Sequence, residues 1–391
     1  VRVAPRDTAM PSAANNSSSS SASLEHEGTQ DKVNGAVEPA TVCVMADDYN
    51  ENACLQGAAC DILASVIAWA VAREGVPLNV SGPLVIADYG ASHGANSSVP
   101  AIAAAQAFGS LRASSGLPSV DSVLMVQDLP ENNFTELLKV TKSALPDSIT
   151  PVAVGGSFYE RVLPRNSLHL GFSSTAMHWL SSPVPALLEG DIFPIQALGS
   201  DEAFAFSDRA ASDWAQLLRM RSEELVTGGL LVLANLARTD YGKTGSEALY
   251  NLMSRTAKNL CAEGVITEKQ LHRLTFNDWY RSRAEFEDPV ALAAASLVVE
   301  RHDTEFVRFP MEHATSDPEA FAQKITDYAR GWSESTVFST FSHPASSGSG
   351  TEGTAGELTR TFFERVRLSI QENPSAYDSP LFYSFLVLRK V

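Results

Sequence analysis

The segment that decides the fold spans residues 84–100 and has the sequence LVIADYGASHGANSSVP. Residues 84–89 form an almost continuous apolar run, which predicts a buried strand. Gly90 and Gly94 follow, and residues 99–111 predict a helix. A strand that passes through a glycine turn into a helix is typical of parallel α/β sheets, whose cofactors bind at the carboxyl ends of the strands. The third glycine of the dinucleotide fingerprint is missing, so the segment alone indicates a nucleotide site and a simple tight turn equally well.

Strands and helices alternate on both sides of this unit. The pattern predicts further strands at 123–126, 152–154, 168–171, 230–236 and 381–388, and helices at 60–72 and 208–225. Residues 243–335 are predicted to be mostly helical. The sequence therefore predicts an α/β protein, with a parallel sheet, helices on both faces and an inserted α-helical cap over the ligand crevice.

Composition divides the chain into four parts. Residues 1–40 are rich in Ser, Asn, Ala and Glu with almost no large apolar side chain, and we expect a disordered tail there. A Rossmann-like cofactor-binding domain is expected over 41–240, and the mostly helical cap over 241–335. We expect the chain to return to the sheet domain over 336–391, with a flexible Ser/Gly/Thr-rich loop at 345–357.

The charge balance argues against nucleic acid as a partner. The 391 residues include 29 Lys and Arg against 46 Asp and Glu, a formal net charge of -17. A surface this acidic repels phosphate backbones, and a small anionic ligand has to be held by local hydrogen-bond donors. No apolar run has the length of a membrane span, and the first residues lack the apolar core of a secretory signal. We therefore expect a soluble protein without a membrane partner.

The cysteine pattern points to a reducing compartment. The four cysteines are too few for a disulfide scaffold and lack the paired spacing of a zinc site; they are Cys43, Cys54, Cys60 and Cys261. We interpret them as buried reduced thiols and expect a cytoplasmic location.

A second motif, VLMVQDLPENNF at 123–134, places Asp128 at the end of a predicted strand. A carboxylate in that position can accept hydrogen bonds from ribose hydroxyls. It can equally act as the N-cap of a following helix. Both interpretations stay open on this segment alone.

A third motif spans residues 155–185 and contains Ser157, Phe158, His178 and Trp179. A single buried Trp or His is most often a structural core residue. At the top of a sheet, however, an indole N–H and an imidazole in an apolar wall form a donor pair that can bind a small anion without a cation.

These segments resemble the plant SABATH family of S-adenosylmethionine-dependent carboxyl methyltransferases, typified by salicylate, benzoate and jasmonate methyltransferases. Residues 155–185 resemble the family's GSFYxRLFPxxSLHFxHSSYSLHWLSxxP, residues 88–97 its DLGCSSGPNT, and residues 127–134 its NDLPxNDF. Residues 49–56 are similar to YxxNSxxQ, and residues 221–238 to RxxELVxGGRMVLTxLGR. The motifs occur in order over about 45–391, and five long motifs together are highly specific. The resemblance implies the sheet of class I methyltransferases.

The resemblance also assigns site residues. It implies that eight residues contact S-adenosylmethionine, with Asp128 on the ribose and Ser157 and Phe158 near the adenine; they are Tyr49, Gly90, Ala91, Asn96, Asp128, Leu129, Ser157 and Phe158. It implies that Gln56 and Trp179 hold the substrate carboxylate and that His178 and Thr175 line the same pocket. Gln56, Trp179 and His178 are therefore the candidate catalytic residues, and S-adenosylhomocysteine is the expected coproduct. A metal is not implied, and a homodimer is compatible with the family.

Four departures from the family pattern concern the substrate and cofactor sites. Thr175 stands where the family has Tyr, and Trp332 is aligned with a position that often carries a smaller aliphatic residue, so a small acid is expected. Ala53 and Ala91 replace Ser and Cys, which should leave cofactor binding intact. The expected activity is methyl esterification of a small carboxylic acid. The alternatives are N-methylation of a small heterocycle and a non-catalytic cofactor-binding role. A nicotinamide dehydrogenase also fits the strand and glycine pattern, but this sequence lacks the third glycine of the dinucleotide fingerprint.

Overall fold

The computed structural model describes residues 45–46, 48–73, 75–78, 82–186, 188, 190–311, 316–343 and 353–391. All of them belong to one unit, Val37–Val391. The disordered tail expected over 1–40 lies outside the described residues, as does most of the loop expected at 345–357. The last residues of that loop, from Ala355 onward, are helical.

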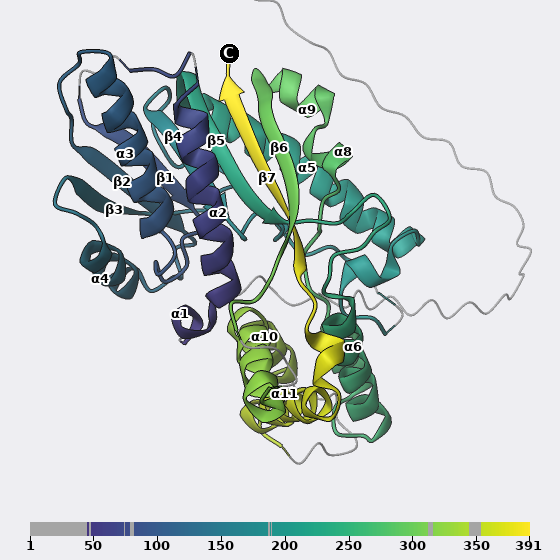
Figure 1. Ribbon diagram of the computed structural model, residues 1–391. Coiled ribbons are helices and arrows are strands. Elements are labelled where there is room, and N and C mark those ends of the chain that lie inside the picture. Colours follow the sequence, from purple (N-terminus) through teal and green to yellow (C-terminus); the bar gives the residue numbers. More distant parts are fainter. Residues whose placement is uncertain are drawn as a thin grey trace, which may run out of the picture. The chain divides into compact units, whose positions relative to one another are not determined.

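The described strands form one seven-stranded sheet (Figure 1). They are β1 (Leu84–Tyr89), β2 (Ser122–Asp128), β3 (Ile149–Gly155), β4 (Leu168–Ser174), β5 (Leu225–Leu236), β6 (Leu297–Val307) and β7 (Leu381–Lys390). Their order is β3-β2-β1-β4-β5-β7-β6. The first five strands are parallel, and β7 pairs antiparallel with both β5 and β6. All six strands predicted from the sequence are confirmed within a few residues, but the sheet is mixed because of this antiparallel edge.

The described helices cover the sheet and build the cap. The longer ones are α2 (Cys54–Val71), α3 (Ser98–Ser114), α4 (Phe134–Ala144), α5 (Asp201–Glu224), α6 (Glu247–Ala262), α10 (Pro318–Phe341) and α11 (Ala355–Glu372). The shorter ones are α1 (Tyr49–Asn52), α7 (Glu268–Arg273), α8 (Arg283–Phe286), α9 (Pro289–Ala294) and the 3₁₀ turns η1 (Pro194–Ala197) and η2 (Pro374–Tyr377). The helices expected at 60–72, 99–111 and 208–225 are α2, α3 and α5.

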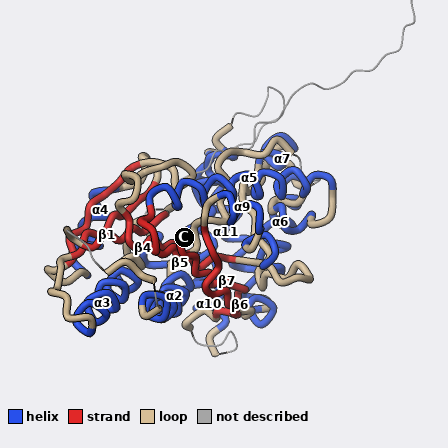
Figure 2. The backbone as a smooth tube through the Cα atoms, turned by 90° about the horizontal axis from the view of Figure 1, so that it is seen from above, coloured by secondary structure: helices blue, strands red, loops and turns tan. Residues whose placement is uncertain are grey.

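Successive side chains of a strand point to opposite faces of the sheet, and here both sets are apolar, so each face has its own hydrophobic core. In β5, Leu230 and Val232 belong to the core that contains α2 and α3, whereas Leu231 and Leu233 belong to the core that contains α5. This is the two-residue period of a strand that is buried on both faces. Figure 2 shows α2 and α3 on one side of the sheet and α5 on the other. The expected helices on both faces are confirmed.

Helix α2 is the one described helix whose length and hydropathy match a membrane span. Half of it is buried inside the protein, and its apolar side chains pack in the core under the sheet; they include Leu55, Leu63 and Ile67, which are fully buried. The same residues that resemble a membrane span therefore form a core helix.

The expected cap differs from the structure in its interior and at its end. Strand β6 lies within 241–335, and its polar sequence ERHDTEF follows neither an apolar run nor a clean alternation because it forms the edge of the sheet. Helix α10 continues past residue 335 and packs on α11, so residues up to Glu372 belong with the helices. Figure 1 shows α6, α10 and α11 grouped at the carboxyl ends of the parallel strands. The cap is thus formed by two helical stretches separated by a strand.

Candidate functional site

The site lies where β1 and β4 are neighbours in the sheet. Strand order reverses here, because β1 continues toward β2 and β3 while β4 continues toward β5. Such a switch point opens a crevice beyond the carboxyl ends of the parallel strands. Gly90 follows β1, Ser157 follows β3, and Thr175 follows β4, while Asp128 is the last residue of β2. The register thus brings residues of three separate sequence motifs to one edge.

The turn after β1 requires glycine. Gly90 has φ +79°, in the left-handed region, and a Cβ at this position would meet the Cβ of Ala176 at 2.5 Å. Gly94 has φ +86°, and its Cβ would meet the hydroxyl oxygen of Thr141 at 2.5 Å. Both positions are closed to any side chain. The turn is therefore a close approach of backbone segments, as its glycines predicted.

The Asp128 carboxylate is held by backbone N–H groups. It accepts hydrogen bonds from the N–H of Ser92 at 2.6 Å and of Leu129 at 2.8 Å. Burial raises its pKa, and these two donors lower it. The N-cap of α4 is Asn133, whose side chain accepts from Glu136 N–H. Asp128 is therefore not a helix cap, and its carboxylate is oriented in the crevice.

A cavity of about 130 Å³ lies above this edge. Six of the eight residues assigned to the cofactor line it, namely Tyr49, Gly90, Asp128, Leu129, Ser157 and Phe158. The other two, Ala91 and Asn96, line an adjoining cavity together with Tyr49, Gly90 and the buried Asp88. Burial raises the pKa of Asp88 to about 7, against the hydrogen bond from Ser97. The structure thus brings all eight predicted residues together.

A buried ion pair supports the loop that carries Ser157 and Phe158. Arg221 and Glu224 of α5 are fully buried and lie 2.8 Å apart. Arg221 donates to the carbonyl oxygens of Phe158 and Glu160, and Glu224 accepts from the N–H of Val162. A buried pair of this kind fixes the position of the loop more than it stabilises the fold. These two residues are the Arg and the Glu at the start of the 221–238 motif, to which the sequence analysis assigned no role in the site.

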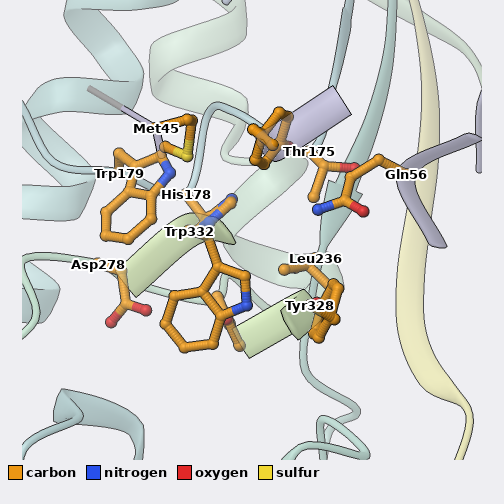
Figure 3. A pocket seen from close by; sticks show the side chains of 11 residues that line it. Met45, Gln56, Thr175, His178, Trp179, Leu236, Asp278, Tyr328 and Trp332 are labelled. Carbon is orange, nitrogen blue, oxygen red and sulfur yellow. The ribbon is translucent and has the colours of Figure 1, made fainter. Parts of the chain in front are cut away.

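A third cavity, of about 30 Å³, lies beside the first under the cap (Figure 3). All five residues assigned to the substrate line it, namely Gln56, Thr175, His178, Trp179 and Trp332. Thr175 and Trp179 also line the larger cavity, so the two spaces adjoin. Three buried polar atoms here have no hydrogen-bond partner, namely Gln56 Oε1, His178 Nδ1 and Trp332 Nε1.

Among the described residues, none with a cationic side chain lines this third cavity. Burial, together with the nearby charge of Arg281, lowers the pKa of His178 to about 3, so its imidazole is neutral at pH 7. Thr175 has φ +58°, and its hydroxyl lies 3.2 Å from that of the buried Tyr383. The pocket can therefore form hydrogen bonds with a small anion, but it does not neutralise one.

Sequence reasoning missed several residues of this pocket: Met45, Leu236, Asp278, Tyr280 and Tyr328. Tyr328 precedes Trp332 by one turn of α10, and that spacing was the one signal available for it. Asp278 reaches the pocket because residue 278 forms a β-bridge with residue 179. Only tertiary pairing brings these two segments together. Among the described residues, no group of three or more His, Cys, Asp or Glu could hold a metal ion.

Comparisons with known proteins agree with this geometry. A family model described as SAM dependent carboxyl methyltransferase matches residues 44–372. The salicylate/benzoate carboxyl methyltransferase of Arabidopsis thaliana is 30% identical over 249 residues, which are 58% of this chain and 63% of that protein. The salicylate carboxymethyltransferase of Clarkia breweri is 29% identical over 231 residues, 56% of this chain and 63% of that protein. The matches thus span less than two thirds of these relatives.

A solved structure has the same fold. The structure of loganic acid methyltransferase with SAH matches with a TM-score of 0.73 and covers 89% of this chain and 98% of that one. At 24% identity, this similarity concerns the architecture alone. The sheet, its helices and the cap are therefore shared with that protein.

Proposed function

Because the chain belongs to the S-adenosylmethionine-dependent carboxyl methyltransferase family, we propose that it methylates a small carboxylic acid, forming a methyl ester and S-adenosylhomocysteine. One observation carries the proposal: a pocket with neutral hydrogen-bonding side chains directly adjoins the cavity at the switch point. Thr175 and Trp179 belong to both walls, so ligands in the two cavities would lie side by side.

The described residues fit the cofactor. Asp128 is oriented by two backbone donors and keeps lone pairs for ribose hydroxyls. Ser157 and Phe158 line the same cavity, and we assign them to the adenine. The Gly90 turn leaves no room for a side chain, so the backbone can approach the ligand closely. The unpartnered Ser92 hydroxyl faces the same cavity and is a further candidate donor.

Positioning accounts for the proposed chemistry. S-adenosylmethionine supplies an electrophilic methyl group, which a carboxylate oxygen attacks as the carbon–sulfur bond breaks and its electron pair stays on sulfur. A carboxylic acid with a pKa of about 4 is already ionised at pH 7, so no general base is required. The neutral imidazole of His178 fits this scheme, since it neither removes a proton nor pairs with the carboxylate.

Neutral donors are better suited than a cation to hold the nucleophile. We assign the amide of Gln56 and the indole N–H of Trp179 to one carboxylate oxygen, which leaves the other free to attack. A Lys or Arg would bind the carboxylate more strongly, but it would also lower the reactivity of both oxygens. The donor in this role is the Nε2 amide group of Gln56, because its Oε1 can only accept a hydrogen bond.

The proposal includes a small substrate and a reducing compartment. The substrate-side cavity is only about 30 Å³, and Trp332 occupies its wall from the cap, which supports a small acid over a long one. Cys54, Cys60 and Cys261 are free thiols, which supports a cytoplasmic location. Of these three only Cys60 is buried, so the expectation of buried thiols was wrong for the exposed Cys54 and the half-buried Cys261, and Cys43 lies outside the described residues. The net charge of -17 supports a small-molecule partner over nucleic acid.

A product screen tests the proposed function. The protein is incubated with labelled S-adenosylmethionine and a panel of small acids and purine heterocycles, and methyl products are identified by mass spectrometry. We expect methyl esters from at least one acid, and at least about tenfold slower turnover for Gln56→Leu with unchanged cofactor affinity by calorimetry. Methylation of heterocycles only would favour N-methylation, and cofactor binding without any product would favour a non-catalytic role. Loss of cofactor affinity in Gln56→Leu would contradict its assignment to the carboxylate.

A further inference from the structure

The substrate-side pocket contains a carboxyl group that the proposed chemistry does not use. Asp278 lines the cavity together with His178, Trp179 and Trp332, and its side chain is almost fully buried. Among the described residues, only its own backbone N–H donates a hydrogen bond to this carboxyl group. An acidic group with so few partners is unfavourable in an apolar wall, because burial penalises its charged form.

No cation of the described residues neutralises Asp278. The nearby Arg281 is buried, but it donates to the carbonyl oxygen of Met177 at 2.7 Å and of Ala210 at 2.8 Å. The ion pairs of the described residues do not include Asp278. Burial accordingly raises the pKa of its carboxyl to about 7. The group therefore keeps hydrogen-bonding capacity that only a ligand in the cavity can use.

The pocket has two chemically different ends. Figure 3 shows Gln56 on one side of the cavity and Asp278 on the other, with His178 and Trp332 between them. The indole nitrogen of Trp179 points away from Asp278 in this view. A carboxylate bound to Gln56 and the Trp179 N–H is thus kept apart from the Asp278 carboxyl, which faces the far end of the substrate.

We propose that Asp278 is a specificity-determining residue that accepts a hydrogen bond from a hydroxyl or amine at the end of the substrate opposite its carboxylate. The inference rests on the proposed function and narrows it to hydroxy- or amino-substituted acids. Plain acids leave the buried carboxyl group without a partner.

Matched acids test this assignment. One series compares 5-hydroxypentanoate and 5-aminopentanoate with hexanoate, and a second compares 4-(hydroxymethyl)benzoate and 4-(aminomethyl)benzoate with 4-ethylbenzoate. Within a series the molecules have nearly the same shape. We expect the wild type to prefer a donor-bearing acid in kcat/KM by at least about tenfold in the series that it accepts. Asp278→Leu should abolish this preference, chiefly by slowing the donor-bearing acid.

The Asn variant separates the two donor classes. Asp278→Asn keeps a carbonyl acceptor, so it should retain part of a preference for the hydroxyl acid and lose a preference for the amino acid. Calorimetry with S-adenosylmethionine verifies that each variant folds and binds the cofactor. The matched control is Asp208→Leu, because Asp208 is exposed on α5, and we expect wild-type kinetics from it.

Two results would overturn the inference in distinguishable ways. Methyl esters formed without any preference for donors, or a Leu variant that slows plain and substituted acids equally, would reject the role of Asp278 and leave the proposed function standing. Absence of ester from every acid, with intact cofactor binding, would reject the proposed function and this inference with it.

Discussion

Two aspartates, one at each end of the site, have different surroundings: Asp128 is half-buried, and Asp278 is buried. Asp128 accepts hydrogen bonds from two backbone N–H groups, Ser92 and Leu129. Asp278 accepts one only from its own backbone N–H. The end that contains Asp128, which we call the cofactor end, is thus formed by backbone close to the strands, and the Asp128 carboxylate is already oriented. The end that contains Asp278, which we call the substrate end, is formed by side chains under the cap. Several of its polar atoms have no hydrogen-bond partner among the described residues. A site built in this way can keep one cofactor while its substrate pocket changes.

We expect the largest effect from a substitution in the glycine turn at the cofactor end. Gly90→Val adds a side chain where a Cβ already meets Ala176 at 2.5 Å, on a backbone with positive φ. We expect loss of cofactor binding by calorimetry and at least about a hundredfold lower kcat/KM, because the turn must move. Gly109→Ala is the control, since Gly109 is an exposed residue of α3 with open space at its Cβ. Wild-type cofactor affinity in Gly90→Val would show that the turn is not part of this cavity.

A smaller effect is expected from the carboxylate that the backbone orients. Asp128→Asn removes one charged acceptor, and the Kd for S-adenosylmethionine should rise roughly thirtyfold, as for a lost hydrogen bond to a charged group. Glu131→Gln, an exposed change on the same loop, should leave the Kd unchanged. If both variants bind the cofactor alike, Asp128 does not contact the ribose.

The substrate end should respond in turnover rather than in cofactor affinity. Trp179→Phe keeps an aromatic ring in the wall and removes the N–H, so kcat should fall roughly tenfold, as for one lost donor. The Kd for the cofactor should stay within about twofold of the wild type. Trp69→Phe is the control, because Trp69 lies on α2 outside the described walls of the site. An equal effect of Trp179→Phe on Kd and kcat would place this residue at the cofactor end instead.

The smallest expected effect is a pH-dependent change in the Tm of the Asp278→Asn variant, which tests whether Asp278 differs from Asp128 in lacking partners. Burial raises the pKa of Asp278 to about 7, above its value of about 3.8 in an unfolded chain. The folded protein therefore binds this proton more tightly, and the carboxyl group costs stability progressively as the pH rises through that window. Asp278→Asn should remove the cost, so its Tm relative to wild type should be higher at pH 8 than at pH 5, by roughly 3 °C.

Thermal unfolding at the two pH values, with no acid added, measures this difference. Asp88 is buried with a similarly raised pKa and contributes equally to wild type and variant, so its contribution cancels. A Tm difference that does not change with pH would mean that the Asp278 carboxyl has a partner in solution.

Local pattern was sufficient for most of the fold. The strand, glycine turn and helix at 84–100 occur as predicted because strand period, glycine geometry and apolar runs are properties of a few consecutive residues. Strand β6 was missed because an edge strand with one solvated face carries the charged residues of a surface segment. The end of the cap was misplaced because α10 is stabilised by packing on α11, which no local pattern reveals.

The sequence by itself determined the cofactor end of this protein. Gly90, Asp128 and Ser157 each stand at or within two residues of the end of a strand, so knowing the strands was enough to place them in one crevice. Only the tertiary structure decided the substrate end. Its residues come from distant segments: Gln56 lies on α2, Asp278 in a loop that forms a β-bridge with Trp179, and Trp332 on the cap helix α10. Only long-range packing makes them neighbours. Short-range geometry is encoded in short segments, whereas a pocket under a cap exists only once distant segments have packed together.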